Sequence, residues 1–264
     1  MTLLKPIPNQ DKWMNLKKTA FQTIVIDNSI FMIPNKSKYQ KKTFFFLLLL
    51  FVLLFLIECS HTQHEGKVNK HMHKTSTKDL IEMFESPERD AFQEPDQVIR
   101  FIGNINGKKI LDIGTGSGYF SFRFARKGAN VIAGDVNDEF LSHIEKRKTE
   151  ENYKPGSIET RKLYYDSPNL NKQEVDIVFI CNVFHHIDNR ISYLEKIRNG
   201  LKPAGKVVIV DFPKNDTAIP FGGPPMDMRV SESEAKLELE KAGFKVTRMD
   251  TKILPYQYLL EAKL

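Results

Sequence analysis

The sequence has few cysteines, and most of it lacks an excess of charge of either sign. Cys59 and Cys181 are the only two cysteines, too few for a disulfide framework, and Cys181 falls in an apolar run typical of a buried thiol. Residues 1–60 hold eight lysines and three acidic residues, which leaves 31 basic and 30 acidic residues in the rest of the chain. Because nucleic-acid binding needs clustered basic charge, this balance argues against a nucleic-acid partner.

One long apolar run is present, at Phe44–Ile57. As a helix its 14 residues would reach about 21 Å, short of the roughly 30 Å hydrocarbon core of a bilayer. Four lysines between residues 36 and 42 precede the run and two between residues 67 and 70 follow it. The pattern predicts a signal-peptide core or membrane anchor at 44–59 with the N-terminus inside, which places the following domain outside the cytoplasm; a domain facing the cytoplasm is the alternative.

Cys59 directly follows the run and resembles the processing site of bacterial lipoproteins. Leu56 suits that pattern, whereas Ile57 and Glu58 stand where small residues are expected. Lipidation at Cys59 and an uncleaved anchor therefore both stay open as ways of holding the protein at a membrane. The basic leader, 1–43, is unusually long for such a signal, and a chain that started at Met32 would have an ordinary one.

A polar linker, 60–78, follows and contains four of the seven histidines in the chain. Imidazoles are good ligands for transition metals, but no carboxylate or cysteine spacing here fixes a coordination geometry. We interpret the linker as solvated chain, and we predict no metal site.

The remaining segment, 79–264, alternates strand-like and helix-like patterns. This alternation predicts an α/β domain with a mostly parallel sheet covered by helices on both faces. The last two strands are joined by residues 251–255 alone, too few for a helical crossover, so the final strand should be antiparallel. The predicted strands are 108–113, 130–135, 158–165, 175–182, 206–211, 244–250 and 256–263, and the predicted helices are 119–127, 138–148, 190–201 and 232–242.

A glycine-rich turn follows the first predicted strand in the sequence ILDIGTGSGYF. Ligands of such sheets bind at the carboxyl ends of the strands, where Gly114, Gly116 and Gly118 would lie. The dinucleotide pattern needs a glycine at position 119, which is Tyr119 here. Asp112 would repel a pyrophosphate and attract an ammonium or sulfonium group. The turn therefore favours S-adenosylmethionine over a dinucleotide as the cofactor.

Two further carboxylates follow the next strands. Asp135 ends the second strand, 19 residues after Gly116, and is placed to accept hydrogen bonds from both ribose hydroxyls. Asp166 follows the third strand and is placed to meet the adenine amino group; a simple turn residue is its alternative reading.

These motifs together resemble class I S-adenosylmethionine-dependent methyltransferases over residues 80–264. The resemblance implies a Rossmann-like, seven-stranded sheet whose last strand is antiparallel. It places Asp112 and the three glycines around the methionine moiety, Asp135 on the ribose and Asn182 near the cofactor. The segment 86–99 also resembles the lead-in of a bacterial subgroup, some members of which carry secretory leaders. The sequences that carry the resemblance are ILDIGTGSGYFS, VIAGDVN, VDIVFICNVFHHI, KVVIVDF and AGFKVTRMD with YQYLLEAK.

Methyl transfer needs a base only where the acceptor carries a proton. His185 and His186 follow the fourth strand and are candidates, with Asp211 a weaker one; a packing role for one histidine is the alternative. Without a basic groove, we expect a small-molecule acceptor. A non-catalytic exported or anchored binding protein and a dinucleotide-dependent reductase stay open as alternatives, because S-adenosylmethionine is made in the cytosol while the leader points outward.

Overall fold

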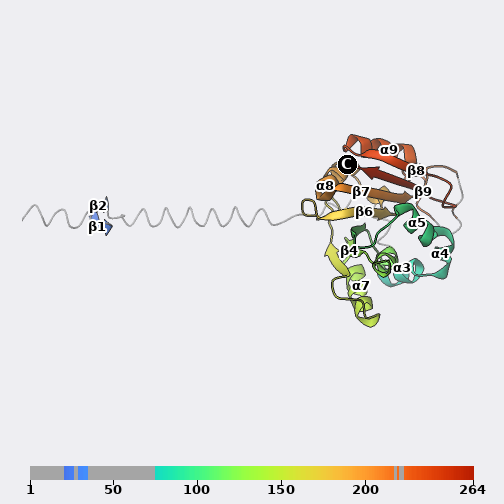
Figure 1. Ribbon diagram of the computed structural model, residues 1–264, viewed down its shortest axis with the longest axis horizontal. Coiled ribbons are helices and arrows are strands. Elements are labelled where there is room, and N and C mark those ends of the chain that lie inside the picture. Colours follow the sequence, from blue (N-terminus) through green and yellow to red (C-terminus); the bar gives the residue numbers. More distant parts are fainter. Residues whose placement is uncertain (1–20, 27–28, 35–74, 217–218, 220–222) are drawn as a thin grey trace, which may run out of the picture. The chain divides into compact units, whose positions relative to one another are not determined.

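The computed structural model describes residues 21–26, 29–34, 75–216, 219 and 223–264 (Figure 1). The chain divides into two compact units, 1–62 and 63–264. The predicted anchor at 44–59, Cys59 and most of the predicted linker lie outside the described residues. Among the residues that are described, no helix is both long enough and apolar enough to cross a membrane.

A two-stranded antiparallel sheet lies in the first unit. Its strands are β1 (Phe21–Ile26) and β2 (Ser29–Pro34), paired so that Phe21 lies opposite Pro34. These two strands were not predicted from the sequence pattern. Met32, the alternative start, lies on β2, and a start there stays a prediction.

The second unit contains a seven-stranded sheet in the order β5-β4-β3-β6-β7-β9-β8 (Figure 1). The first five strands of that order pair in parallel, and β9 runs antiparallel to both of its neighbours. The predicted fold class and the antiparallel last strand are thus confirmed. The strands are β3 (Lys109–Ile113), β4 (Asn130–Asp135), β5 (Ile158–Lys162), β6 (Val175–Cys181), β7 (Leu201–Asp211), β8 (Lys245–Asp250) and β9 (Tyr258–Lys263).

Helices cover both faces of this sheet. Neighbouring side chains of β6 show this: Ile177 and Phe179 join one buried cluster, and Val178 and Ile180 join the other. The first cluster includes residues of α5 and α6, and the second includes residues of α8 and α9. Such two-sided burial explains why the central strands are almost continuously apolar. The four predicted helices are present as α6 (Tyr119–Arg126), α7 (Asp138–Glu150), α8 (Arg190–Gly200) and α9 (Glu232–Lys241).

Three short helices ahead of the sheet were not assigned from the sequence. They are α3 (Thr77–Phe84), α4 (Pro87–Gln93) and α5 (Pro95–Ile102). A proline begins both α4 and α5, a position at which its missing N–H costs no hydrogen bond. Glu94 between them adopts φ 41°, which turns the chain from one helix into the next. We call α3 and α4 the lead-in helices.

Two strand boundaries differ from the prediction by three residues or more. The third strand was predicted to run to Tyr165, but β5 ends at Lys162 because Tyr164 and Ser167 pair across a turn. The fifth was predicted from Lys206, but β7 starts at Leu201, directly after α8.

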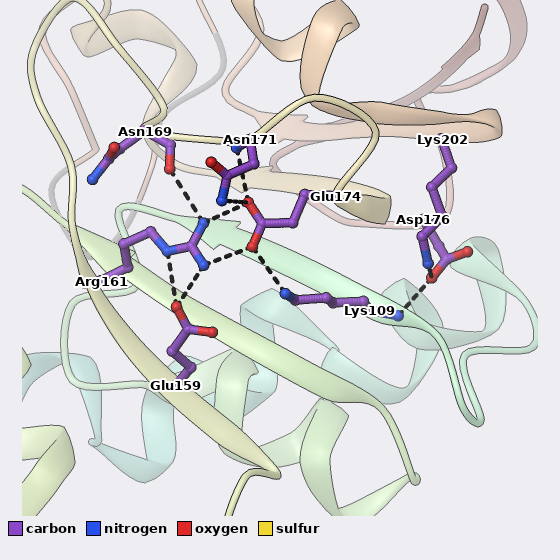
Figure 2. A network of polar contacts seen from close by, with 8 residues as sticks. All are labelled: Lys109, Glu159, Arg161, Asn169, Asn171, Glu174, Asp176 and Lys202. Atoms are coloured by element: carbon purple, nitrogen blue, oxygen red, sulfur yellow. Dashed lines mark hydrogen bonds and ion pairs between the residues drawn. The ribbon is translucent and has the colours of Figure 1, made fainter. Parts of the chain in front are cut away.

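A charged network joins the amino-terminal ends of β3 and β6 to β5, as Figure 2 shows. Arg161 donates two hydrogen bonds to Glu174, of 2.8 and 2.7 Å, and Lys109 lies 2.9 Å from the same carboxylate. The Arg161 and Glu174 side chains are 14% and 10% exposed. These hydrogen bonds, first among them those from Arg161, hold the pKa of Glu174 well below its usual range. Lys109 and Glu174 lie at the end of the sheet opposite the glycine turn, and Arg161 reaches them from β5, so we assign the network to stability.

Candidate functional site

The glycine turn connects β3 to α6 and is built from left-handed backbone. Gly114, Gly116 and Gly118 have φ values of 66°, 54° and 85°, which favour glycine. A Cβ on Gly114 would lie 2.4 Å from a methyl carbon of Val183, and one on Gly118 would lie 2.7 Å from the ring of Phe122. Both the conformation and the available space therefore require glycine at these positions.

Asp112, on β3, ties the turn to the strand and to α6 through its side chain. Its Oδ2 accepts hydrogen bonds from Ser121 Oγ at 2.7 Å and Thr115 Oγ1 at 3.1 Å. The side chain is 3% exposed, and burial raises its pKa to about 6, while the two hydroxyls and the nearby Arg89 act in the opposite direction. At neutral pH Asp112 is thus mainly a carboxylate in a region that disfavours charge.

Asp135 is brought to the same turn from the end of β4. Its Oδ2 accepts from the backbone N–H of Gly116 at 2.9 Å, and its Oδ1 accepts from that of Asn137 at 2.9 Å. Burial raises the pKa of Asp135, and the backbone donors oppose the rise. A carboxylate oxygen has two lone pairs, so each oxygen of Asp135 can accept a further hydrogen bond. The predicted juxtaposition of Asp135 with the glycine turn is present.

Asn182 follows β6 and joins a closed set of three side-chain amides. It donates from Nδ2 to Gln93 Oε1 at 3.1 Å, Gln93 Nε2 donates to Gln257 Oε1 at 2.8 Å, and Gln257 Nε2 donates back to Asn182 Oδ1. Asn182 has φ 59°, and Gln93 and Gln257 are buried. The amide set ties α4 to the carboxyl end of β6. Neither glutamine was singled out from the sequence.

Asp166 has a different environment from the two buried aspartates. Its side chain is 63% exposed and lies 3.4 Å from the ammonium of Lys196 on α8. A contact with the adenine amino group stays a prediction.

His185 and His186 form a short 3-10 turn after β6, with their ring centroids 4.2 Å apart. His185 Nδ1 lies 2.7 Å from Asp211 Oδ1, and its backbone N–H donates to Asp211 Oδ2 at 3.1 Å. Both residues of this pair are buried. Because the carboxylate accepts, the proton of neutral His185 is on Nδ1 and Nε2 is left as an acceptor.

His186 has no such support among the described residues. Its Nδ1 is buried without a hydrogen-bond partner there, and burial together with the neighbouring His185 lowers its pKa to about 4. His186 is therefore neutral at physiological pH.

Arg89 of α4 also lies at this site and was not singled out from the sequence. Its guanidinium carbon is 4.0 Å from the centroid of the Tyr119 ring, and Nη1 donates to the carbonyl of Phe84 at 3.1 Å. The Phe84 ring itself would come within 3.1 Å of a Cβ on Gly116. The lead-in helices thus bring Phe84 and Arg89 onto the glycine turn. The resemblance of 86–99 to a known lead-in was the sequence signal for this contact.

The residues at the turn fit S-adenosylmethionine. The glycines allow the left-handed turn whose backbone N–H at Gly116 meets Asp135, and Asp112 and Asp135 supply two acceptors. Ser117, within the turn, is fully buried, and its hydroxyl has no hydrogen-bond partner among the described residues. A buried hydroxyl of this kind is available to a ligand. Asp112, Asp135 and the turn would hold the cofactor.

Comparisons with known proteins agree with this geometry. A family model described as a methyltransferase domain matches residues 111–209. The crystal structure of an S-adenosylmethionine-dependent methyltransferase from Aquifex aeolicus superposes with a TM-score of 0.64 and 26% identity, over 71% of this chain and 98% of that one. The chain has the fold of class I methyltransferases. The matching family model and the similar structure indicate S-adenosylmethionine as its cofactor.

Curated relatives of this methyltransferase domain carry two different names. The tRNA U34 carboxymethyltransferase of Aeromonas salmonicida (strain A449) is 30% identical over 166 residues, which are 58% of this chain and 50% of that protein. The ubiquinone biosynthesis O-methyltransferase of Shewanella pealeana is 30% identical over 117 residues, 43% of this chain and 47% of that protein. The chain spans about half the length of these relatives. Their names do not agree on an acceptor.

Proposed function

We propose that this protein transfers the methyl group of S-adenosylmethionine to a small-molecule acceptor. The observation that carries the proposal is the glycine turn after β3, where buried Asp112 accepts a hydrogen bond from Thr115 and Asp135 accepts one from the N–H of Gly116. The near balance of 31 basic and 30 acidic residues after residue 60 supports a small molecule over a nucleic acid.

When bound, S-adenosylmethionine supplies a methyl group already activated on a positively charged sulfur. The chain's task is then to align the acceptor and exclude water. We propose that water is excluded by Phe84 and Arg89, which the lead-in helices bring onto the glycine turn.

An acceptor that carries a proton also needs a base, and we propose His185. Asp211 fixes its Nδ1 as the protonated nitrogen, so Nε2 is the atom that would take the proton. His186, with its pKa of about 4, would give little driving force for that transfer.

Titration calorimetry of the full-length chain tests the cofactor. We expect S-adenosylmethionine to bind with micromolar affinity, and Asp135→Ala to weaken this binding at least about tenfold through loss of a charged acceptor. Asp138→Ala is the control, because this neighbouring carboxylate is 76% exposed and pairs with Lys162. Binding of NADH instead would favour a reductase, and binding of neither would contradict the proposal.

A labelled-methyl assay against cell extract tests the acceptor. The extract is divided into RNA, protein, lipid and small-molecule fractions. Label in the small-molecule fraction supports the proposal. Label in the RNA fraction would show that the acceptor is RNA and not a small molecule. Binding without any labelling would favour a non-catalytic binding protein.

We also propose that the protein is attached to a membrane through 44–59 or a lipid on Cys59, with the methyltransferase domain outside the cytoplasm. The support is the apolar run and the lysine bias before it. Fractionation of cells carrying a C-terminal epitope, followed by external protease, tests it. An epitope that stays protected would place the domain on the cytoplasmic side, where S-adenosylmethionine is made.

A further inference from the structure

Helix α3 ends on the glycine turn but is weakly attached to the rest of the fold. Leu80 is the one residue of this helix that is buried, and the side chains of Lys78 and Glu82 are 84% and 68% exposed. Phe84, its last residue, places its ring 3.1 Å from where a Cβ on Gly116 would lie. Short elements with few buried contacts open locally at the lowest cost in free energy.

Both ends of α3 are fastened to α7. At the start, Asn137 Nδ2 donates a hydrogen bond of 3.3 Å to Thr77 Oγ1, and Asn137 is the residue that caps α7. At the end, the ring of Phe84 lies beside that of Phe140, with 5.9 Å between their centroids. Helix α3 therefore lies alongside α7, and its position on the glycine turn depends on these contacts.

Glu85, which follows α3 directly, adds a charged contact to this set. Its Oε1 accepts from Arg147 Nη1 at 2.9 Å and lies 3.3 Å from His143 Nε2, so two side chains of α7 share one carboxylate oxygen. Arg147 is itself held in place, because its guanidinium carbon lies 4.1 Å from the centroid of the Phe122 ring and its Nε lies 2.5 Å from Glu151. Arg147 is thus already in position when α3 comes to lie on α7.

We infer that α3 is a lid on the cofactor site and that Glu85 holds this lid closed. When the lid leaves α7, it carries Phe84 away from Gly116, and S-adenosylmethionine enters or leaves. When Glu85 meets Arg147 again, the site is closed. The inference rests on the proposed function and adds a step to it, the exchange of the cofactor. Glu85 is a positioning residue, because it contacts α7 and acts on the glycine turn through Phe84.

The lid predicts an effect on rates and not on affinity. Glu85 stabilises the closed lid equally with and without the cofactor, so its removal should speed both entry and release and leave the affinity nearly unchanged. A residue that contacted the cofactor would lose affinity when removed. Glu85→Gln keeps the size of the side chain, and Arg147 keeps its ion pair with Glu151, so the variant should fold.

Release of the cofactor from the full-length chain measures the lid directly. The protein is loaded with methyl-labelled S-adenosylmethionine and chased with an excess of unlabelled S-adenosylhomocysteine, and the bound label is followed with time. We expect Glu85→Gln to release the label about three- to tenfold faster than wild type, because a partly exposed charged contact is lost. Titration calorimetry should give dissociation constants within about twofold of each other. Higher salt should speed release from wild type more than from Glu85→Gln, because salt screens the ion pair.

Glu82→Gln is the matched control. Glu82 lies on the same helix, is 68% exposed and is 3.9 Å from Lys78 of α3 itself, so its substitution should leave the release rate within about twofold of wild type. Hydrogen exchange gives a second readout. The backbone amides of 77–85 should exchange faster in Glu85→Gln than in wild type, while those of β3 and β4 stay unchanged.

Three results would count against these assignments. Equal release rates, or equal exchange of 77–85, in wild type and Glu85→Gln would overturn the lid while leaving the proposed function in place. Equal acceleration of release by Glu82→Gln would show a general loosening of α3 and would overturn the role of Glu85. A wild-type protein that binds no S-adenosylmethionine in the calorimeter would contradict the proposed function itself.

Discussion

Replacing Asp112 by asparagine should stabilise the free protein at neutral pH and weaken cofactor binding. Burial raises the pKa of this 3% exposed carboxyl from 3.8 to about 6. At about 1.4 kcal/mol for each pKa unit, an ionised Asp112 costs the folded state about 3 kcal/mol. Asparagine removes the charge and keeps an oxygen that can accept from Ser121 and Thr115, so the cost is removed without loss of these hydrogen bonds.

The sign of the pH dependence follows from the raised pKa. Below pH 3.8 Asp112 is protonated in both the folded and the unfolded state and has no effect. Between pH 3.8 and about 6 Asp112 loses its proton in the unfolded state but keeps it in the folded state, so wild-type stability falls as the pH rises. Above about pH 6 Asp112 is ionised in both states, and the loss of stability no longer changes with pH. The gain from Asp112→Asn should therefore be about 1 kcal/mol at pH 4.5 and about 3 kcal/mol at pH 7.5.

Urea unfolding of both proteins, followed by circular dichroism at these two pH values, measures the gain. Asp166→Asn is the control, because this carboxylate is 63% exposed and its substitution should change stability by less than about 0.5 kcal/mol. An Asp112→Asn variant that is less stable than wild type at pH 7.5, or whose gain is equal at both pH values, would refute the argument. Unchanged affinity for S-adenosylmethionine would show that the charge of Asp112 does not serve the cofactor.

Two other substitutions test the glycine turn and the charged network. Gly114→Ala should lower the free energy of unfolding by about 1–3 kcal/mol and weaken S-adenosylmethionine binding, because its Cβ would overlap Val183 in a left-handed turn. Urea unfolding measures the first effect and calorimetry the second. Normal binding would contradict the role of the turn. Glu174→Gln should cost about 1.5–3 kcal/mol at pH 7, because it replaces the charged partner of Arg161 and Lys109 while Arg161 keeps its ion pair with Glu159. The difference should shrink as the pH falls below 4.5, because the stability from a lowered pKa is lost on protonation. Melting curves at pH 7 and pH 4 measure this difference, with Glu150→Gln as the exposed control. Equal melting temperatures for wild type and Glu174→Gln at pH 7 would refute the argument.

Much of the sheet follows from local patterns. Central strands are short apolar runs that end at or just before a polar residue or glycine, as at Gly114 after β3 and Asp135 in β4. Side-chain caps begin α7 at Asn137 and α9 at Ser231. A capping box at Ser231 and Glu234 begins α9, with Ser231 Oγ accepting from Glu234 N–H and Glu234 Oε2 accepting from Ser231 N–H. Parallel strands place their carboxyl ends at one edge, so the strand-end residues could be predicted to meet.

The lead-in helices could not be predicted in this way. Each is seven or eight residues long, too short for a helical periodicity to stand out, and prolines interrupt the segment. The pairing of Gln93 with Gln257 joins residues 164 positions apart. No local pattern encodes such a pair, because it exists only once the sheet has formed.

The amide set explains why these distant residues matter for the site. Asn182 has φ 59°, a left-handed backbone conformation that is strained for residues other than glycine. Such a residue keeps this conformation only where neighbouring groups stabilise it. Its side chain is held by Gln93 from α4 and Gln257 ahead of β9, while its backbone N–H donates to Val210 on β7. The next residue, Val183, lies against Gly114. Placement of α4 by this amide set therefore fixes two things together: the chain that packs against the glycine turn, and the helix that carries Arg89 to the Tyr119 ring at the start of α6.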